Sequence, residues 1–361
     1  MAAISGKSAI VGAYEYPKRR DPSASALGIH ALCAKAALEE AGLTKDDVDA
    51  YFTSGVGGMP PITMCEFLGI RPTYIDSTSI GGSSFVSHVG HAAGAIASGL
   101  VDVALITYGS IAWSQLQAIG TGGRAQGEYA DQFEIPYGPT TVGSYALAAQ
   151  RYEHEFGGTV EKRAEVSVAT RKWAQLNPDA MFRDPLTIQD VVNSRVISSP
   201  LHFFECCVIS DGGGAVVMAS AERARDLKQK PVYVLGVGEA VDHATMSQMP
   251  DLLTIPAKLS GEKAFRLAGL KPADVQVAEV YDSYTITVLL SLEALGFCKR
   301  GEAADFVAGQ RTAPGGAFPL NTDGGGLSSN HPGMRGIFTV IEATRQLRGQ
   351  RGKAQVQGAK V

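Results

Sequence analysis

Two stretches of the chain repeat each other: residues 37–48 read ALEEAGLTKDDV, and residues 264–275 read AFRLAGLKPADV. Both follow the pattern Ala-x3-Ala-Gly-Leu-x3-Asp-Val. Each predicts the last turn of an amphipathic helix followed by a glycine, Gly42 or Gly269, in the position just beyond the helix end. A polar turn and an apolar strand follow in both copies. This shared order of helix, glycine, turn and strand predicts an internal duplication.

A second pair of segments supports the duplication. Gly81-Gly82-Ser83-Ser84 opens an alanine-rich helix, and Gly324-Gly325-Gly326-Leu327-Ser328-Ser329 precedes His331-Pro332 and another helix. In both places a glycine-rich turn brings small hydroxyl residues to a helix start, where free N–H groups and the positive dipole end can stabilise an oxyanion. Simple capping of a helix by glycine and serine explains the same pattern.

The rest of the chain alternates apolar strands with helices. We expect strands at residues 8–13, 48–53, 101–108, 213–218, 231–238 and 275–281. We expect helices at residues 25–41, 88–98, 142–155, 161–175, 221–228, 256–268, 285–296 and 336–347. Long apolar strands interleaved with helices are typical of a mainly parallel sheet covered on both faces. The proline-containing residues 110–210 are expected to form an insertion of the kind that shapes a substrate pocket.

Composition sets limits on the class of protein. With 361 residues, 45% apolar and 19% charged, the chain should fold as two packed halves. A net charge of -4 without a lysine-rich cluster argues against a nucleic-acid or membrane-surface partner. The most apolar stretch, residues 92–108, is interrupted by Asp102 and is not expected to span a membrane. The N-terminus does not resemble a secretory signal, so we expect a cytoplasmic protein. The five cysteines form no CxxC pair, so we expect no metal site.

Common nucleotide and hydrolase motifs are incomplete in this sequence. Gly236-Val237-Gly238 lacks the third glycine of a dinucleotide-binding turn, and Gly6-Lys7-Ser8 lacks the first glycine of a phosphate loop. The sequence also contains no Gly-x-Ser-x-Gly nucleophile elbow. These observations argue against a Rossmann dehydrogenase, a P-loop nucleotidase and an α/β-hydrolase.

Taken in order, five segments resemble the thiolase superfamily, most closely its sterol-carrier-protein type. They are Ala37–Val48, Thr78–Ser98, Ser210–Ala215, Tyr281–Thr285 and Asn330–Gly333. The resemblance implies an α/β thiolase fold, with two duplicated βαβαβαββ halves in a five-layer α-β-α-β-α sandwich. The N-terminal half would cover residues 1–229, with the insertion at about 110–210. The C-terminal half would cover residues 230–361 and would lack the final strand, with the second cysteine that follows it in thiolases.

The chain departs from thiolases at the nucleophile. In that family a cysteine stands at the start of the helix after the first glycine-rich segment, which corresponds to Gly82-Ser83-Ser84-Phe85 here. No cysteine lies between Cys65 and Cys206. A thiolate accepts the acyl group in thiolysis, and a serine without a neighbouring base stays protonated. The remaining cysteines are more simply interpreted as packed thiols.

The resemblance implies two further site residues. His331, in the segment that matches the Gly-His-Pro motif of thiolases, would face the reactive carbonyl; a helix-capping histidine is the alternative. Tyr281, in Tyr281-Asp282-Ser283-Tyr284, stands where thiolases carry the residue that helps to build an oxyanion site. Its phenol could exchange a proton or donate to an oxyanion, although an ordinary pKa near ~10 must fall before it acts as a base. A hydroxyl that reaches a backbone carbonyl is the alternative.

A scaffold that stabilises a thioester enolate can also break a carbon–carbon bond without a cysteine. If the β-carbon of an acyl-CoA carries a hydroxyl, removal of its proton releases a carbonyl product and leaves the enolate: a retro-aldol cleavage. The chain resembles thiolase-like steroid side-chain aldolases, which carry a tyrosine at the position of Tyr281. We therefore predict a lyase acting on a 3-hydroxyacyl-CoA of lipid or steroid type.

Roles follow for individual residues. Tyr281 would accept the hydroxyl proton, His331 would bind the thioester oxyanion or reprotonate the enolate, and Asp282 would orient Tyr281 or the local backbone. Ser83 and Ser84 would fill the vacated nucleophile pocket, and Ser84 is itself a candidate nucleophile. The residues expected beside the substrate are Ser83, Tyr284, Ser329 and Asn330.

Two other functions remain open from the sequence. The first is an acyl-CoA acyltransferase or thiolase in which Ser84, or a cysteine of a partner chain, takes the acyl group. The second is a non-catalytic acyl-CoA-binding subunit. Coenzyme A enters as part of the substrate, and no covalently bound cofactor is expected. The resemblance also implies a homodimer, formed through the edge of the first-half sheet, and a small partner protein with an OB-fold and often a zinc ribbon.

Overall fold

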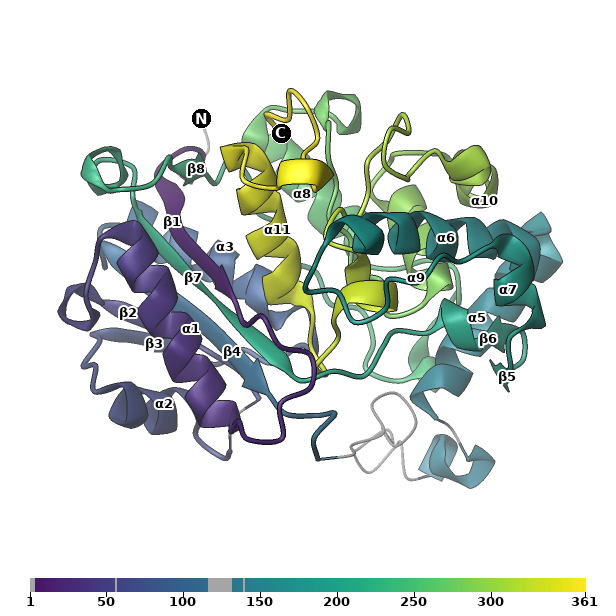
Figure 1. Ribbon diagram of the computed structural model, residues 1–361, viewed down its shortest axis with the longest axis horizontal. Helices are drawn as coiled ribbons and strands as arrows, with labels where there is room; N and C mark the ends of the chain where they lie inside the picture. Colours follow the sequence, from purple (N-terminus) through teal and green to yellow (C-terminus); the bar gives the residue numbers. More distant parts are fainter. Residues whose placement is uncertain (1–3, 56, 116–131, 139) are drawn as a thin grey trace.

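A six-stranded sheet organises the first half of the computed structural model, which describes residues 4–55, 57–115, 132–138 and 140–361. The strand order is β3-β2-β4-β7-β1-β8 (Figure 1). The strands are β1 (Ser8–Glu15), β2 (Ala50–Phe52), β3 (Tyr74–Asp76), β4 (Val103–Ser110), β7 (Gly212–Ser220) and β8 (Val232–Tyr233). A separate two-stranded ribbon joins β5 (Val196–Ser198) to β6 (Leu201–His202).

Helices cover both faces of this sheet. One face is buried by α1 (Ala26–Ala41) and α2 (Pro60–Leu68), and the other by α3 (Ser84–Ala97) and α11 (Gly336–Arg348). The remaining helices are α5 (Thr141–Phe156), α6 (Val160–Leu176), α7 (Ile188–Asn193), α8 (Ala257–Ala268), α9 (Thr285–Ala294) and α10 (Ala303–Phe306). In Figure 1, α11 lies between the sheet and this second group of helices, so it belongs to a central layer.

The sheet is mixed, and the expectation of a mainly parallel sheet was wrong. Strand β2 pairs in parallel with β3 and β4, but β7 lies between β4 and β1 and is antiparallel to both. The segment between β4 and β7 leaves the sheet at Ser110 and returns to it at Gly212, the residue that pairs with Ser110, so the chain re-enters at the same end and β7 runs antiparallel to β4.

The structure supports the duplication in the geometry of both copies. Gly42 after α1 and Gly269 after α8 adopt left-handed φ angles of 78° and 70°, as the repeated sequence predicts. The segment that precedes each helix also repeats a contact. A side chain at Gly12, on β1, would overlap the backbone of Ala37, and one at Gly236, beyond the end of β8, would overlap the backbone of Ala264. Ala37 and Ala264 are the first residues of the two repeated sequences, so both copies bring a glycine against the same helix position.

The second half forms fewer regular strands than expected. Of residues 231–238 only β8 is a strand, and it pairs with β1 of the first half. Residues 275–281 make a single bridge, between Ala278 and Leu320. Isolated hydrogen bonds hold this segment in place of a ladder: the Ala278 N–H donates to the Pro319 carbonyl at 3.1 Å, and the Val280 N–H donates to Asn321 Oδ1 at 2.8 Å. The helix expected at 221–228 is reduced to one 3₁₀ turn, Arg223–Asp226, because Leu227 already has an extended backbone.

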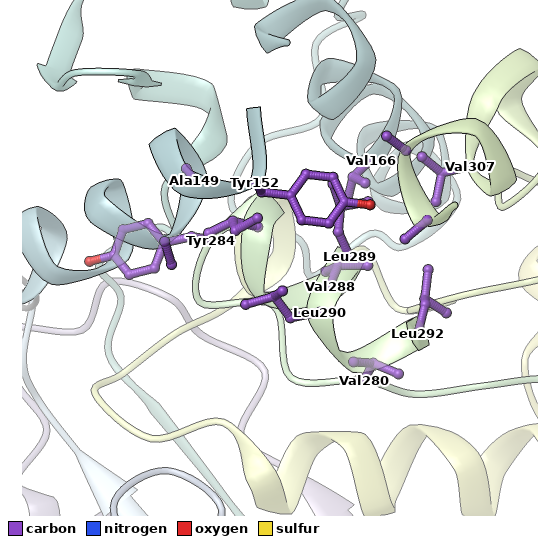
Figure 2. Packing of buried hydrophobic residues seen from close by; sticks show 14 of the residues in the cluster. Ala149, Tyr152, Val166, Val280, Tyr284, Val288, Leu289, Leu290, Leu292 and Val307 are labelled. Carbon is purple, nitrogen blue, oxygen red and sulfur yellow. The ribbon is translucent and has the colours of Figure 1, made fainter. Parts of the chain in front are cut away.

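The insertion packs with the second half. A single apolar core joins α5 and α6 to α9, α10 and the segment before α9 (Figure 2). Tyr152 of α5 is fully buried there beside Leu289 and Val307. Arg163 of α6 is fully buried as well, and its Nε lies 2.7 Å from Glu205 Oε1. This packing fixes α9 and the segment that leads into it, whose Tyr281 hydroxyl accepts a hydrogen bond from the Arg335 N–H at the start of α11 at 3.2 Å.

Candidate active site

Tyr281 and His331, distant in sequence, form a hydrogen-bonded pair. The Tyr281 hydroxyl lies 2.8 Å from His331 Nε2, and the two rings meet edge-on with centroids 5.7 Å apart. Tyr281 ends the extended segment before α9, and His331 lies between the second glycine-rich turn and α11. The His331 backbone N–H donates to Ser210 Oγ at 3.1 Å, and the Tyr108 hydroxyl donates to the carbonyl of Pro332 at 2.5 Å. These contacts fix the histidine on the sheet.

The phenol of Tyr281 lies against the first glycine-rich turn. A side chain at Gly82 would overlap the hydroxyl and ring of Tyr281. The Gly82 carbonyl accepts a hydrogen bond from the N–H of Gly336, at the start of α11, at 2.9 Å. The starts of α3 and α11 therefore meet at Tyr281. The absence of a side chain at Gly82 is what leaves room for the aromatic ring.

Burial sets the protonation states of the pair. It raises the pKa of Tyr281 well above its usual range, so the phenol stays protonated. Burial, helped by the nearby Arg335 cation, lowers the pKa of His331 to about 4, so the imidazole is neutral at physiological pH. A neutral imidazole can accept the phenol proton at Nε2, and its Nδ1 has no hydrogen-bond partner among the described residues. The pair is therefore a weak acid bonded to a neutral acceptor.

Asp282 orients the second glycine-rich turn. Its carboxylate accepts hydrogen bonds from the N–H groups of Gly326 at 2.7 Å and Leu327 at 3.2 Å, and it lies 3.1 Å from Arg335 Nε. Burial raises the pKa of Asp282 to about 6, and Arg335 opposes that rise. Two roles were predicted for Asp282: orienting Tyr281 or orienting the local backbone. Its hydrogen bonds go to backbone N–H groups of the glycine-rich turn, and none of those described goes to the Tyr281 phenol.

The serines of the first turn lie in different environments. Ser84 is fully buried, and its hydroxyl donates to the Gly81 carbonyl at 2.6 Å and accepts from the Ile80 N–H at 2.9 Å. No described base contacts that hydroxyl, so its contacts are those of a turn. Ser83 is exposed at the start of α3 and makes no capping bond with its side chain. Only Ser83 of the two has a side chain that solvent reaches.

The other residues predicted beside the substrate bond inside the protein. Tyr284 is 3% exposed and stacks on Tyr145, with ring centroids 4.4 Å apart, in the core drawn in Figure 2. Ser329 Oγ accepts from Asn177 Nδ2 at 3.3 Å. Asn330 donates to Glu15 Oε1 at 2.6 Å and accepts from Arg335 at 2.6 Å. Packing accounts for all three side chains, and their contact with substrate stays a prediction.

No cysteine of the chain is disposed to be a thiolate. Burial raises the pKa of Cys65 to about 11 and those of Cys206 and Cys298 to about 12, and it raises Cys33 and Cys207 further. A thiol that stays protonated near neutral pH is a poor acyl acceptor. This chain's own cysteines therefore do not supply the missing nucleophile.

Sequence reasoning missed two residues that build the site. Arg335 is fully buried beside the pair, and Asp323 shares it, with its Oδ1 2.6 Å from Arg335 NH2. The available signal was an arginine at the start of an apolar helix, four positions after the histidine. A charged residue at such a boundary is usually exposed, so the sequence gave no reason to place it inside.

Among the described residues, no helix is long and apolar enough to cross a membrane. Within the same residues, no group of three or more histidine, cysteine, aspartate or glutamate side chains could hold a metal ion.

Known proteins resemble the chain over almost its whole length. The family described as thiolase C-terminal domain-like matches residues 238–361. The 17-hydroxy-3-oxo-4-pregnene-20-carboxyl-CoA lyase of Mycobacterium tuberculosis is 38% identical over 360 residues, which span 96% of this chain and 92% of that protein. The steroid side-chain-cleaving aldolase of Thermomonospora curvata is 36% identical over 97% of this chain and 92% of its own.

Among solved structures, the Ltp2-ChsH2(DUF35) aldolase superposes with a TM-score of 0.88 at 34% identity, covering 97% of this chain and 92% of that one. These matches confirm the thiolase fold expected from the sequence. The protein belongs to the thiolase superfamily, as a sterol-carrier-protein-type thiolase-like member.

Proposed function

We propose that the protein cleaves a 3-hydroxyacyl-CoA thioester by a retro-aldol reaction, with Tyr281 and His331 as its catalytic pair. Coenzyme A is part of the substrate. One relative is named as a lyase of a steroid carboxyl-CoA, and another is named as a steroid side-chain-cleaving aldolase. Both names describe chemistry of this class. We infer a substrate of lipid or steroid type on the same grounds.

A proton relay reconciles the chemistry with a phenol that resists ionisation. As the substrate β-hydroxyl approaches, its proton passes to the Tyr281 oxygen while the phenol proton passes to His331 Nε2. The bond between the α- and β-carbons breaks, the β-carbon leaves as a ketone or aldehyde, and the electron pair remains on the thioester as its enolate. The same proton then returns through Tyr281 to the α-carbon. No free phenolate is needed at any stage.

The observation that carries this proposal is the Tyr281–His331 bond of 2.8 Å beside Gly82, at the helix start that corresponds to the thiolase nucleophile. The aromatic ring occupies the place beside the turn, and the only buried hydroxyl of that turn, Ser84, already bonds to the backbone on both sides. The site offers acid–base chemistry and no acyl acceptor.

The test compares two substrates. The purified protein, alone and with its small partner, is incubated with 17-hydroxy-3-oxo-4-pregnene-20-carboxyl-CoA, the substrate in the name of the M. tuberculosis relative. Retro-aldol cleavage would yield a 17-ketosteroid and propanoyl-CoA in equal amounts, with no free CoA consumed and no protein adduct in the intact mass. CoA-dependent cleavage of a 3-ketoacyl-CoA with an acylated protein would instead support a thiolase.

We also propose a homodimer through the edge of the first-half sheet. Strand β3 is the outer strand on that side. Ile75 on β3, Ile80 beyond it and Val86 on α3 are 49%, 38% and 47% exposed. An apolar edge strand of this kind is normally covered by another chain. Light scattering would report the mass, and Ile75→Lys should give a monomer if this edge is the interface.

Further expectations stay proposals of the same kind. A small partner with an OB-fold and a zinc ribbon is supported by the two-component name of the Ltp2-ChsH2(DUF35) neighbour. A cytoplasmic location is supported by five cysteines that are all free. The division into halves at residues 229 and 230 is supported by the repeated contact of a glycine, Gly12 or Gly236, with the backbone of the helix that follows it.

A further inference from the structure

Arg335 is a fully buried cation at the start of α11 whose guanidinium makes four contacts with three residues. Its Nε lies 3.1 Å from Asp282 and its NH2 lies 2.6 Å from Asp323. Its NH1 donates to the carbonyl of Asn330 at 3.2 Å and to the Asn330 side chain at 2.6 Å. A planar guanidinium can hold three directions at once, which a lysine ammonium cannot do with the same geometry.

These partners are the chain neighbours of the catalytic pair. Asp282 directly follows Tyr281, and Asn330 directly precedes His331. The backbone N–H of Arg335 also donates to the Tyr281 hydroxyl at 3.2 Å. One residue therefore joins the segment that carries the phenol to the loop that carries the imidazole, and it touches the phenol oxygen as well.

We propose that Arg335 is a positioning residue that holds the Tyr281 hydroxyl at hydrogen-bonding distance from His331. This inference rests on the proposed retro-aldol function, because it gives Arg335 its role through that pair. An error of about 1 Å in such a pair costs on the order of 10²-fold in rate, so a clamp on both neighbours has a direct effect on turnover.

The charges around the pair agree with this role. Asp282 and Asp323 bond to Arg335, and Glu15 bonds to Asn330, Arg19 and Arg345. The other ionisable groups near Tyr281 are Tyr108, Tyr145 and Cys207, which burial keeps neutral. Arg335 is thus the cation that acts on His331, and it lowers the pKa of the imidazole.

The decisive variant is Arg335→Lys, which keeps the positive charge but loses the planar guanidinium that contacts three residues at once. We expect kcat for the 3-hydroxyacyl-CoA to fall by about 10²-fold with little change in KM, because the pair is misplaced while the binding surface remains. The matched control is Arg348→Lys, also on α11. The Arg348 side chain is 1% exposed and lies 3.1 Å from Glu40, away from the pair. An equal fall in kcat for both variants, or no fall for Arg335→Lys, would overturn the inference.

A second variant decides the question if Arg335→Lys does not fold. Asn330→Leu removes the side-chain contact between Arg335 and the neighbour of His331, and leaves both aspartate pairs and the two arginine partners of Glu15 in place. A loss of kcat without a matching rise in KM supports the clamp. Unchanged kcat in folded Asn330→Leu contradicts it.

A spectroscopic readout separates this inference from the proposed function. The ¹⁵N shifts of the His331 ring, assigned with His331→Gln, report whether Nε2 accepts the phenol proton. In the wild type Nε2 should be an acceptor, and in Arg335→Lys that signal should be lost while the signals of His30 stay in place. A wild type that fails to cleave the substrate overturns the proposed function alone. An unchanged His331 signal in Arg335→Lys overturns the clamp alone.

Discussion

The two glycine-rich turns occupy corresponding helix starts in the two halves but differ in what they do. The first, at residues 81–84, is partly exposed, and its buried serine bonds only to nearby backbone. The second, at residues 324–331, is buried throughout and is tied by Asp282 and Arg335. In a thiolase the first turn carries the nucleophile. Here the first turn lies against the Tyr281 ring, and the groups that we propose as reactive, Tyr281 and His331, come from the C-terminal part of the chain.

Replacing Tyr281 tests this division most strongly. Tyr281→Phe keeps the ring against Gly82 and removes only the hydroxyl, so we expect cleavage to fall by about 10³-fold because the proton relay is lost. Product release would be followed by mass spectrometry, and circular dichroism would check the fold. Turnover near that of the wild type would remove the second half from the mechanism.

The histidine should matter less than the phenol. His331→Gln keeps a polar side chain but loses the neutral proton acceptor, and we expect kcat to fall by about 10²-fold. The measurement is the steady-state rate with saturating substrate. A fall confined to KM would show that His331 binds the substrate and does not move the proton.

Lowering the pH should reversibly reproduce the loss of activity that is expected on replacing His331. Because the pKa of His331 is lowered to about 4, the ring is neutral above that pH and gains a proton as the pH falls through it. The acid limb of kcat/KM should therefore fall at about pH 4 and should be absent in His331→Gln. A limb near the ordinary histidine pKa that disappears in His331→Gln would mean that the ring is not buried in the active protein, whereas a limb near pH 6 that persists in this variant would belong to Asp282.

Adding a methyl group at Gly82, in the first glycine-rich turn, should displace the Tyr281 phenol that lies against it. Gly82→Ala would press on the Tyr281 phenol, so we expect about a tenfold fall in kcat and a loss of about 1–3 kcal/mol in stability. The control is Gly94→Ala in α3, the helix that follows this turn, where an added Cβ meets open space. That change should raise stability by about 0.5–1 kcal/mol and leave kcat unchanged. Equal kinetics in both variants would mean that the two turns are independent.

The smallest kinetic effect is expected from Ser84. Ser84→Ala leaves the Ile80 N–H without its acceptor, which costs about 1–3 kcal/mol of unfolding free energy, and kcat should stay unchanged. Thermal melting and the cleavage rate together provide the test. A large fall in kcat, with loss of any acyl adduct, would make Ser84 the nucleophile and restore the thiolase interpretation.

Much of the fold could be predicted because its signals are local. The repeated Ala-Gly-Leu pattern identified both helix ends, and the ordered motifs identified the family, which the relatives confirm together with the aldolase class. The mixed sheet was missed because strand direction depends on the connection through residues 111–211, which carries no directional pattern. The poorly paired segment at 275–281 was missed because apolar residues alone do not supply a neighbouring strand.

The site was less legible from the sequence. Tyr281 and His331 were named from the resemblance, and their mutual bond requires the fold to bring together residues 50 positions apart. Arg335 and Asp323 were missed because buried charges are rare, and only the structure shows that they compensate each other. The sequence could not show that the Asn330 amide bonds to Glu15 and Arg335, because an exposed amide and a buried one look alike in sequence; its contact with substrate stays a prediction.

The scarcity of strand pairing before α9 has a consequence for hydrogen exchange. The amides of β7, which pairs with β1 on one side and with β4 on the other, should exchange only through global unfolding. The segment before Tyr281 has one bridge and a few isolated hydrogen bonds to backbone and side-chain groups. Its amides should open through smaller fluctuations. Tyr281, which we propose as catalytic, therefore ends a segment with fewer ladder bonds than the sheet, and occupancy of the site should be detectable there as slowed exchange.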